Sequence, residues 1–86
     1  MMLVTFYSVS AALYLETLLK KAHIPCRVIP VPRALSSSCG YAAEVEGETP
    51  DALVQLFKDN AIEWESLYTV HEEDTPPYHQ VAQSAG

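Results

Sequence analysis

The chain has 86 residues, of which 49% are hydrophobic, and its formal net charge is -6 at pH 7. A chain of this length buries roughly 60% of its unfolded surface, which suffices for one small two-layer core and argues against a second domain. The acidic balance argues against nucleic acid as a partner, and no apolar stretch approaches the roughly 20 residues of a membrane-spanning helix, which leaves small molecules and other proteins.

The N-terminal part of the chain predicts a buried strand followed by a helix. Residues 2–7 are apolar and rich in β-prone side chains, as is typical of a central strand. Either Ser8 or Ser10 can cap the next helix, because a serine oxygen accepts a hydrogen bond from the free N–H groups of the first turn. Apolar residues then repeat at helical spacing to about Ala22, and Pro25 ends the helix.

A second strand, a loop and a third strand follow. Residues 26–29 read as a short strand. Pro30 and Pro32 lack the N–H group that a strand ladder needs, so they direct the chain into a loop. Gly40 opens the third strand, in which apolar and more polar residues alternate up to Glu46, as in a half-buried strand.

The last predicted elements are a helix and a fourth strand. Residues 49–51 are Thr, Pro and Asp, which combine a capping oxygen, a proline in the first turn and an acid at the positive end of a helix. Asp59 and Asn60 are a suitable stop for this helix. Residues 62–70 then read as a strand with large apolar side chains.

This order of elements predicts an α+β fold of the ferredoxin-like βαββαβ type. Two helices are expected on one face of a four-stranded antiparallel sheet. We assign residues 1–72 to this domain. Residues 73–86 have no usable periodicity and are expected to form a flexible C-terminal tail.

The turn that contains Cys39 carries the strongest indication of function. A thiolate is the nucleophilic form of cysteine, and nearby cations and hydrogen-bond donors on a partly exposed backbone favour it. Cys39 is therefore the candidate reactive residue, as a nucleophilic thiolate. The candidate supporting residues are Arg33, Ser36, Ser37, Ser38, Gly40, Ser8 and Ser10.

The charge distribution and the predicted topology support this choice. No acidic residue lies between Glu16 and Glu44, whereas four of the five basic residues do. This segregation favours an anion at the site. In the predicted topology the loop before the third strand emerges where the first helix begins, so Cys39 is expected near the positive N-terminus of that helix, at Ser8 and Ser10.

A simpler interpretation of the same residues stays open. Three serines and a glycine are ordinary turn material, and a lone cysteine in a small domain is often buried and inert. The two lysines, Lys20 and Lys21, fit the C-terminal end of a helix and need no anion to explain them.

The cysteine content and the N-terminal segment indicate a reducing compartment. Two cysteines are too few for the disulfide framework of a small secreted domain. Residues 1–6 lack the basic flank and the cleavage site of a signal peptide. We therefore expect a cytoplasmic protein.

The chain resembles the selenium/sulfur carrier protein-like family of small bacterial proteins. The resemblance is carried by residues 29–33 and 35–40, which follow the N-terminal segment 3–8. The resemblance extends over about residues 2–71. It implies a non-catalytic carrier in which Cys39 holds a persulfide or selenyl-sulfide, without a cofactor. The implied partners are a donor protein, such as a cysteine desulfurase, and an acceptor protein. Exposed sheet edges would also allow a homodimer.

Two other functions compete with the carrier. The first is a ligand-binding or regulatory ferredoxin-like module without thiol chemistry, because a fold alone does not determine a function. The second is a thiol-disulfide switch between Cys26 and Cys39, although the spacing is not Cys-x-x-Cys. A shared metal site is not expected, because His23, His71 and His79 fall on a helix end, a strand end and the tail.

Overall fold

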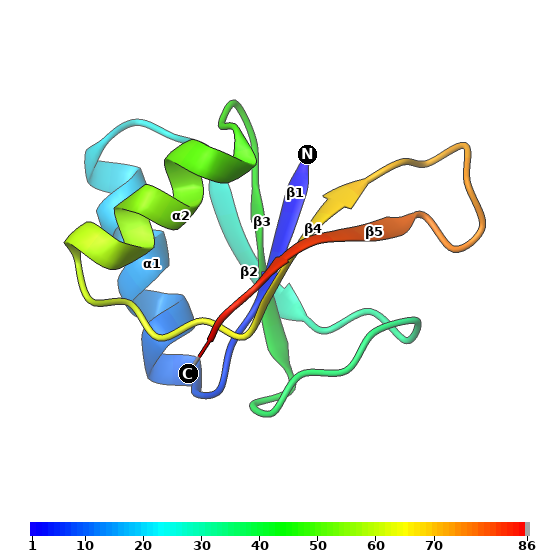
Figure 1. Cartoon of the computed structure of the whole chain (residues 1–86). Coiled ribbons are helices and arrows are strands. Elements are labelled where there is room, and N and C mark those ends of the chain that lie inside the picture. Colours follow the sequence, from blue (N-terminus) through cyan, green and yellow to red (C-terminus); the bar gives the residue numbers. More distant parts are fainter. Residues whose placement is uncertain (86) are drawn as a thin grey trace.

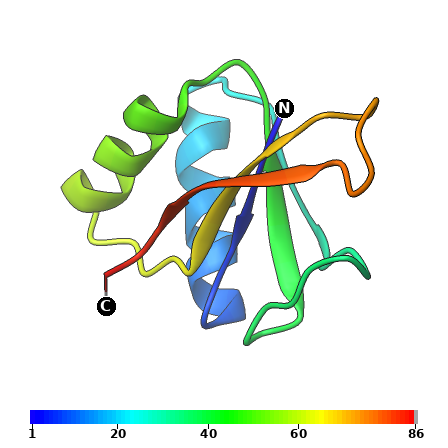
Figure 2. The ribbon, with the colours of Figure 1, turned by 45° about the vertical axis from the view of Figure 1, so that its right-hand side comes forward.

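The computed structural model describes residues 1–85 and shows two helices on one side of a five-stranded sheet (Figures 1 and 2). In chain order the elements are β1 (Met2–Thr5), α1 (Val9–Lys21), β2 (Cys26–Pro30), β3 (Tyr41–Val45), α2 (Pro50–Asp59), β4 (Ser66–Val70) and β5 (Tyr78–Gln83). The α+β class and the two helices agree with the sequence prediction.

The sheet is antiparallel throughout, with strand order β2-β3-β1-β4-β5. Strand β1 lies in the centre, and its residue Met2 is paired with Val45 on one side and with Thr69 on the other. All four residues of β1 are buried, as the apolar composition of this segment predicts. Strands β1 to β4 and the two helices thus occur in the predicted βαββαβ order.

The prediction of a four-stranded sheet is wrong, because the sheet has a fifth strand. Strand β5 comes from the segment expected to be a flexible tail, and it pairs with β4 at the edge of the sheet. Only Tyr78 and Ala82 of this strand are partly buried, so its sequence has no regular apolar alternation that would reveal it. Gly86, the last residue of the expected tail, lies outside the described residues.

Strand β4 begins four residues later than the sequence predicts, at Ser66 rather than at Ile62. Ile62 and Trp64 are buried all the same, and the Trp64 ring lies 5.2 Å from the ring of Phe57 between their centroids. The Glu65 N–H group donates a 2.7 Å hydrogen bond to the Thr5 carbonyl just before the ladder begins. The apolar pattern of residues 62–70 thus predicted burial correctly, but it did not predict where strand pairing begins.

Both helices begin at capping residues that the sequence identifies. The Ser8 hydroxyl accepts a 3.3 Å hydrogen bond from the Ala11 N–H group, so Ser8 is the cap of α1, and not Ser10. Thr49 caps α2 in the same way through the Ala52 N–H group, at 3.2 Å. These caps satisfy donors that would otherwise lack a partner at each helix start.

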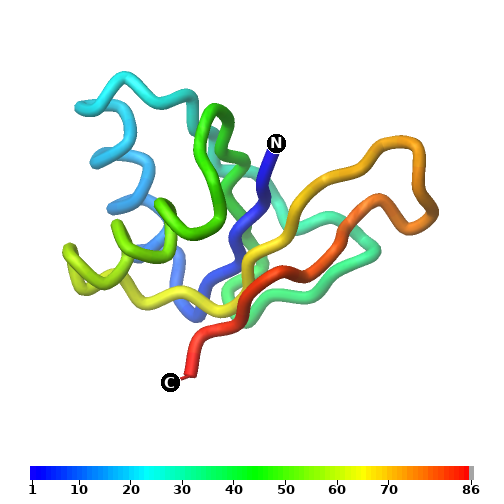
Figure 3. Tube along the Cα trace, turned by 45° about the horizontal axis from the view of Figure 1, so that its top comes forward, coloured from blue at the N-terminus to red at the C-terminus, as the bar shows by residue number. Residues whose placement is uncertain are grey.

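The helices pack on the sheet through one apolar core. Its fully buried side chains, from the helices, the sheet and the β1–α1 connection, include Val4, Phe6, Leu15, Leu19, Val45, Leu53, Phe57 and Leu67. The loops at 31–40 and 71–77 extend on the side of the molecule away from the helices (Figure 3). Both loops therefore lie largely outside the apolar core, where polar side chains can meet solvent.

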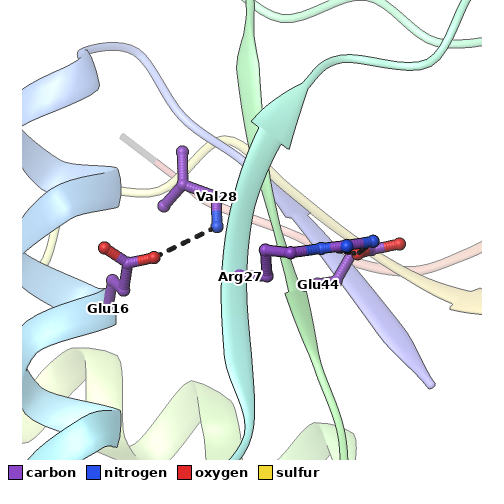
Figure 4. Close-up of polar contacts among 4 residues, drawn as sticks. All are labelled: Glu16, Arg27, Val28 and Glu44. Atoms are coloured by element: carbon purple, nitrogen blue, oxygen red, sulfur yellow. Dashed lines mark hydrogen bonds and ion pairs between the residues drawn. The ribbon is translucent and has the colours of Figure 1, made fainter.

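Side chains on both faces stabilise the edge strand β2 (Figure 4). On the helix side, the Val28 N–H group donates a 3.3 Å hydrogen bond to Glu16 Oε2 of α1. On the opposite face, Arg27 Nη2 lies 2.7 Å from Glu44 Oε1 on β3. Glu16 thus satisfies a backbone donor that an edge strand would otherwise expose.

Candidate functional site

Cys39 lies in a tight turn immediately before β3. The Gly40 N–H group donates a 3.2 Å hydrogen bond to the Ser37 carbonyl, and the Val31 N–H group donates one of 3.0 Å to the Gly40 carbonyl. Gly40 has a φ of 79°, in the left-handed region that favours glycine. The thiol is half-buried and packs against the edge of the apolar core. The backbone therefore holds Cys39 at the boundary between core and solvent.

The Ser37 hydroxyl is the central polar group of this turn. Its oxygen lies 3.1 Å from the Phe6 carbonyl, 3.0 Å from the Tyr41 carbonyl and 3.6 Å from Cys39 Sγ. A hydroxyl has one hydrogen to donate, so it selects one of these acceptors at a time. Because Phe6 directly follows β1, the contact places the turn at the end of β1 from which the chain enters α1, as the topology predicts.

Cys39 Sγ has two polar neighbours. As a thiol it donates to the Tyr41 carbonyl at 3.6 Å. As a thiolate it cannot donate, and the Ser37 hydroxyl 3.6 Å away is then the group that can donate to it. The Ser37 hydroxyl is thus the side-chain donor placed to contact an anionic sulfur on Cys39.

Glu65 anchors the turn, and sequence reasoning missed it. The Ser38 N–H group donates to Glu65 Oε1 at 3.2 Å, and the Ser38 hydroxyl donates to Glu65 Oε2 at 2.7 Å. Glu65 directly precedes β4, whose first residue pairs with Thr5 at the end of β1. The predicted strand order places this point beside the turn, so topology was the signal that could have identified Glu65.

The cations predicted to surround Cys39 are only partly available to it. Arg27 pairs with Glu44 at 2.7 Å, and Lys20 pairs with Glu16 at 3.9 Å. Arg33 is exposed and makes no hydrogen bond or ion pair with another residue among residues 1–85. The charged group attached to the turn is instead the carboxylate of Glu65, so the electrostatic environment differs from the one that the sequence segment alone suggests.

The other predicted supporting residues lie apart from the thiol. Ser36 is exposed and makes no hydrogen bond in the described part of the chain. Ser8 and Ser10 line a shallow pocket of about 320 Å³ between the start of α1 and Ile62, and Cys39 does not line it. The structure thus joins Ser37, Ser38 and Gly40 to Cys39 through one turn, whereas Ser8 and Ser10 border a separate hollow.

Cys26 differs sharply from Cys39 in its surroundings. It packs against the apolar core on the face of β2 toward the helices, level with Val45 of β3. Burial raises the pKa of the Cys26 thiol from 9.0 to about 11; the negative charge of Glu16 adds to this rise and Lys20 opposes it. Cys26 is therefore a protonated, poorly reactive thiol at neutral pH.

The two cysteines lie too far apart for a disulfide within the chain. Both are free thiols, and Cys26 pairs with Val45 at one end of the β2–β3 ladder, whereas Cys39 precedes Tyr41 at the other. Four residues of strand separate these ends, or about 13 Å at about 3.3 Å per residue. A disulfide requires Cα atoms within about 7 Å, so the thiol-disulfide switch needs a large rearrangement.

Comparison with known proteins gives one match. The family described as "Putative Se/S carrier protein-like" matches residues 1–69, which include Cys39, both helices and most of β1 to β4. No curated protein and no solved structure matches the chain. Neither helix among the described residues is long and apolar enough to cross a membrane.

Proposed function

The chain belongs to the Putative Se/S carrier protein-like family, and from this premise we propose that it is a non-catalytic carrier that holds its cargo on Cys39. The cargo is a terminal sulfur, held as a persulfide, or selenium, held as a selenyl-sulfide. The observation that carries the proposal is the contrast between the two thiols. Cys39 lies in a hydroxyl-containing turn at the surface, whereas Cys26 packs against the core with a pKa of about 11.

The transfer needs no oxidant and no reductant beyond the partner proteins. The Cys39 thiolate attacks the terminal sulfur of a persulfide on the donor, forming a new S–S bond while the S–S bond of the donor breaks. The donor leaves as a thiolate, and the transferred sulfur keeps its proton and its oxidation state. An acceptor nucleophile then attacks the terminal sulfur, and Cys39 leaves as a thiolate. Selenium follows the same sequence of bonds.

Ser37, Glu65 and Arg33 are the residues around Cys39 that we assign to this cycle. The Ser37 hydroxyl can donate to the anionic Cys39 sulfur when it turns away from its carbonyl acceptors. Glu65 fixes the backbone at Ser38 and so limits motion of the turn between transfers. The guanidinium of Arg33 is exposed and without an internal partner among residues 1–85, so we assign it to contact with the partner protein.

The partners and the setting follow from this chemistry. We propose a donor protein such as a cysteine desulfurase and an acceptor protein, both acting in the cytoplasm, where thiols stay reduced. The carrier unit is the ferredoxin-like arrangement of β1 to β4 with both helices, within residues 1–72. Strands β2 and β5 are the two sheet edges, where a homodimer would form.

The proposal is tested by loading the protein and measuring its intact mass. Incubation with a cysteine desulfurase and cysteine should add the mass of one sulfur atom to the wild type and to the Cys26→Ser variant. The Cys39→Ser variant should remain unloaded. The two serine variants are matched because each removes one thiol from the same chain.

Equal loading of the Cys39→Ser variant and the wild type would refute the proposal. So would an absence of loading in the wild type with every sulfur or selenium donor tried. The ligand-binding alternative, in which Cys39 has no chemical role, would then take its place.

A further inference from the structure

The hairpin formed by β4 and β5 brings together two histidines that the sequence analysis placed apart. Thr69 of β4 pairs with His79 of β5, and the His71 N–H group donates a 2.6 Å hydrogen bond to the Pro77 carbonyl. The rings of His71 and His79 stack, with 4.3 Å between their centroids and 25° between their planes. The fifth strand therefore creates a histidine pair that a tail would not.

Asp74 adds a carboxylate to this pair. Its N–H group donates a 3.0 Å hydrogen bond to the His71 carbonyl, and its Oδ2 lies 2.9 Å from His79 Nε2. One ligand atom from each of the three residues falls within 4.8 Å of the others. Tetrahedral ligands about 2.1 Å from a zinc ion lie about 3.4 Å apart. Small side-chain rotations, available to the exposed Asp74 and His79, close the remaining difference.

Thr69 orients the His71 ring in the way that metal sites use. Its Oγ1 lies 2.8 Å from His71 Nε2 and 3.4 Å from the His79 carbonyl. When the hydroxyl donates to the carbonyl, it accepts from the Nε2–H group of His71. This leaves the lone pair on Nδ1, which lies 3.8 Å from Glu73 Oε1 on the acidic side of the loop. A histidine ligand typically donates its other ring N–H to such a partner.

The surrounding charge favours a cation. Glu72, Glu73 and Asp74 are consecutive in the loop, and no lysine or arginine follows Lys58 in the sequence. Two imidazoles and a carboxylate suit Zn²⁺ and its first-row neighbours, whereas Mg²⁺ and Ca²⁺ prefer oxygen ligands alone. Glu73 or water is available as a further ligand.

We propose that His71, Asp74 and His79 bind one divalent first-row transition-metal ion, with Zn²⁺ as the reference ion. The inference runs against the sequence expectation of no metal site. It does not depend on the proposed carrier function, because all three residues lie outside the segment matched by the family. The simpler alternative is that the His79–Asp74 contact only stabilises the hairpin, and the experiment separates the two.

The test is a Zn²⁺ titration of the untagged full-length protein by calorimetry at pH 7.5, with Mg²⁺ as the comparison ion. Thiols also bind zinc, so the Cys26→Ser/Cys39→Ser double variant is titrated in parallel and should retain the site. His71→Gln and His79→Gln should each weaken Zn²⁺ binding at least tenfold. The matched control is His23→Asn at an exposed histidine with φ 60°, a conformation that asparagine tolerates, and it should bind as the wild type does.

Direct observation of the imidazoles keeps the proposal testable if a variant misfolds. Zn²⁺ should shift the side-chain ¹⁵N resonances of His71 and His79 in the wild type, and leave those of His23 unchanged. Equal Zn²⁺ affinity of the three histidine variants would overturn the proposal. So would binding that disappears with the two cysteines, or histidine resonances that do not respond to the ion.

Discussion

Cys26 should react with iodoacetamide about 100-fold more slowly than an ordinary thiol. Its pKa is raised from 9.0 to about 11. At pH 8 a thiol with a pKa of 9.0 is about 10% thiolate, whereas one with a pKa of about 11 is only about 0.1% thiolate. Because the thiolate is the form that reacts, the ratio of these fractions sets the expected ratio of rates.

The same raised pKa fixes the sign of a pH effect on stability. The folded chain holds the Cys26 proton more tightly than the unfolded chain does, so the protonated thiol stabilises the fold at pH values below about 9. This contribution is lost as the pH rises through about 11. The Cys26→Ser variant should therefore lose this part of the pH dependence of its unfolding free energy.

Two single-cysteine variants allow the alkylation rate of each thiol to be measured separately. Cys39→Ser leaves Cys26 as the only thiol, and Cys26→Ser leaves Cys39, so mass spectrometry can follow each reaction separately. Glu16→Gln should accelerate the reaction of Cys26, because it removes a charge that raises the pKa while keeping an oxygen that can accept from Val28 N–H. If Cys26 in the folded protein reacts as fast as in guanidinium-unfolded chain, the argument from burial is wrong.

Three further predictions concern the turn and the fifth strand. Gly40→Ala and Gly47→Ala should each lower the free energy of unfolding in urea by about 1 kcal/mol, because both glycines have a positive φ with open space at Cβ. Only Gly40→Ala should also slow sulfur loading. Glu65→Ala should destabilise the fold by about 1 kcal/mol and increase hydrogen exchange in the Cys39 turn, whereas Glu63→Ala, at an exposed neighbour, should do neither. Deleting residues 73–86 should lower stability by more than about 1 kcal/mol, since β5 covers one edge of β4. It should also shift the emission of the single tryptophan to the red, because Trp64 shares a hollow with residues 82–85. An unchanged urea midpoint would contradict this prediction.

Local chemistry in the sequence predicted much of the fold. Thr49 was predicted as a cap and Ser8 as one of two candidates for the other, because a capping oxygen acts within three residues of its own position. Gly40, which the sequence places between the loop and the third strand, has a positive φ that suits glycine at such a turn. These features depend on neighbours in the chain, which the sequence shows directly.

Contacts between distant segments were the part that the sequence could not show. Glu65 reaches Ser38 across 27 residues, so the absence of acids around Cys39 in the sequence did not predict the absence of acids around it in space. The predicted electropositive segment is likewise weakened in the fold, because Arg27 and Lys20 already have carboxylate partners. The charges of a sequence segment therefore indicate the electrostatic environment of a site only when residues that form ion pairs in the fold are left out of the count.

The fifth strand shows how one missed element changes two conclusions. Its exposed residues alternate too weakly to reveal a strand, yet its ladder with β4 places His79 opposite Thr69 and beside His71. The hairpin loop is also closed by hydrogen bonds of its own, from His71 to Pro77 and from Asp74 to His71. The backbone ladder between β4 and β5, which has a register shift between Leu67 and Tyr68, thus brings these polar side chains together without an apolar pattern in β5. Because this register places His79 beside His71 and Asp74, the three residues form a site that can be tested with a metal ion.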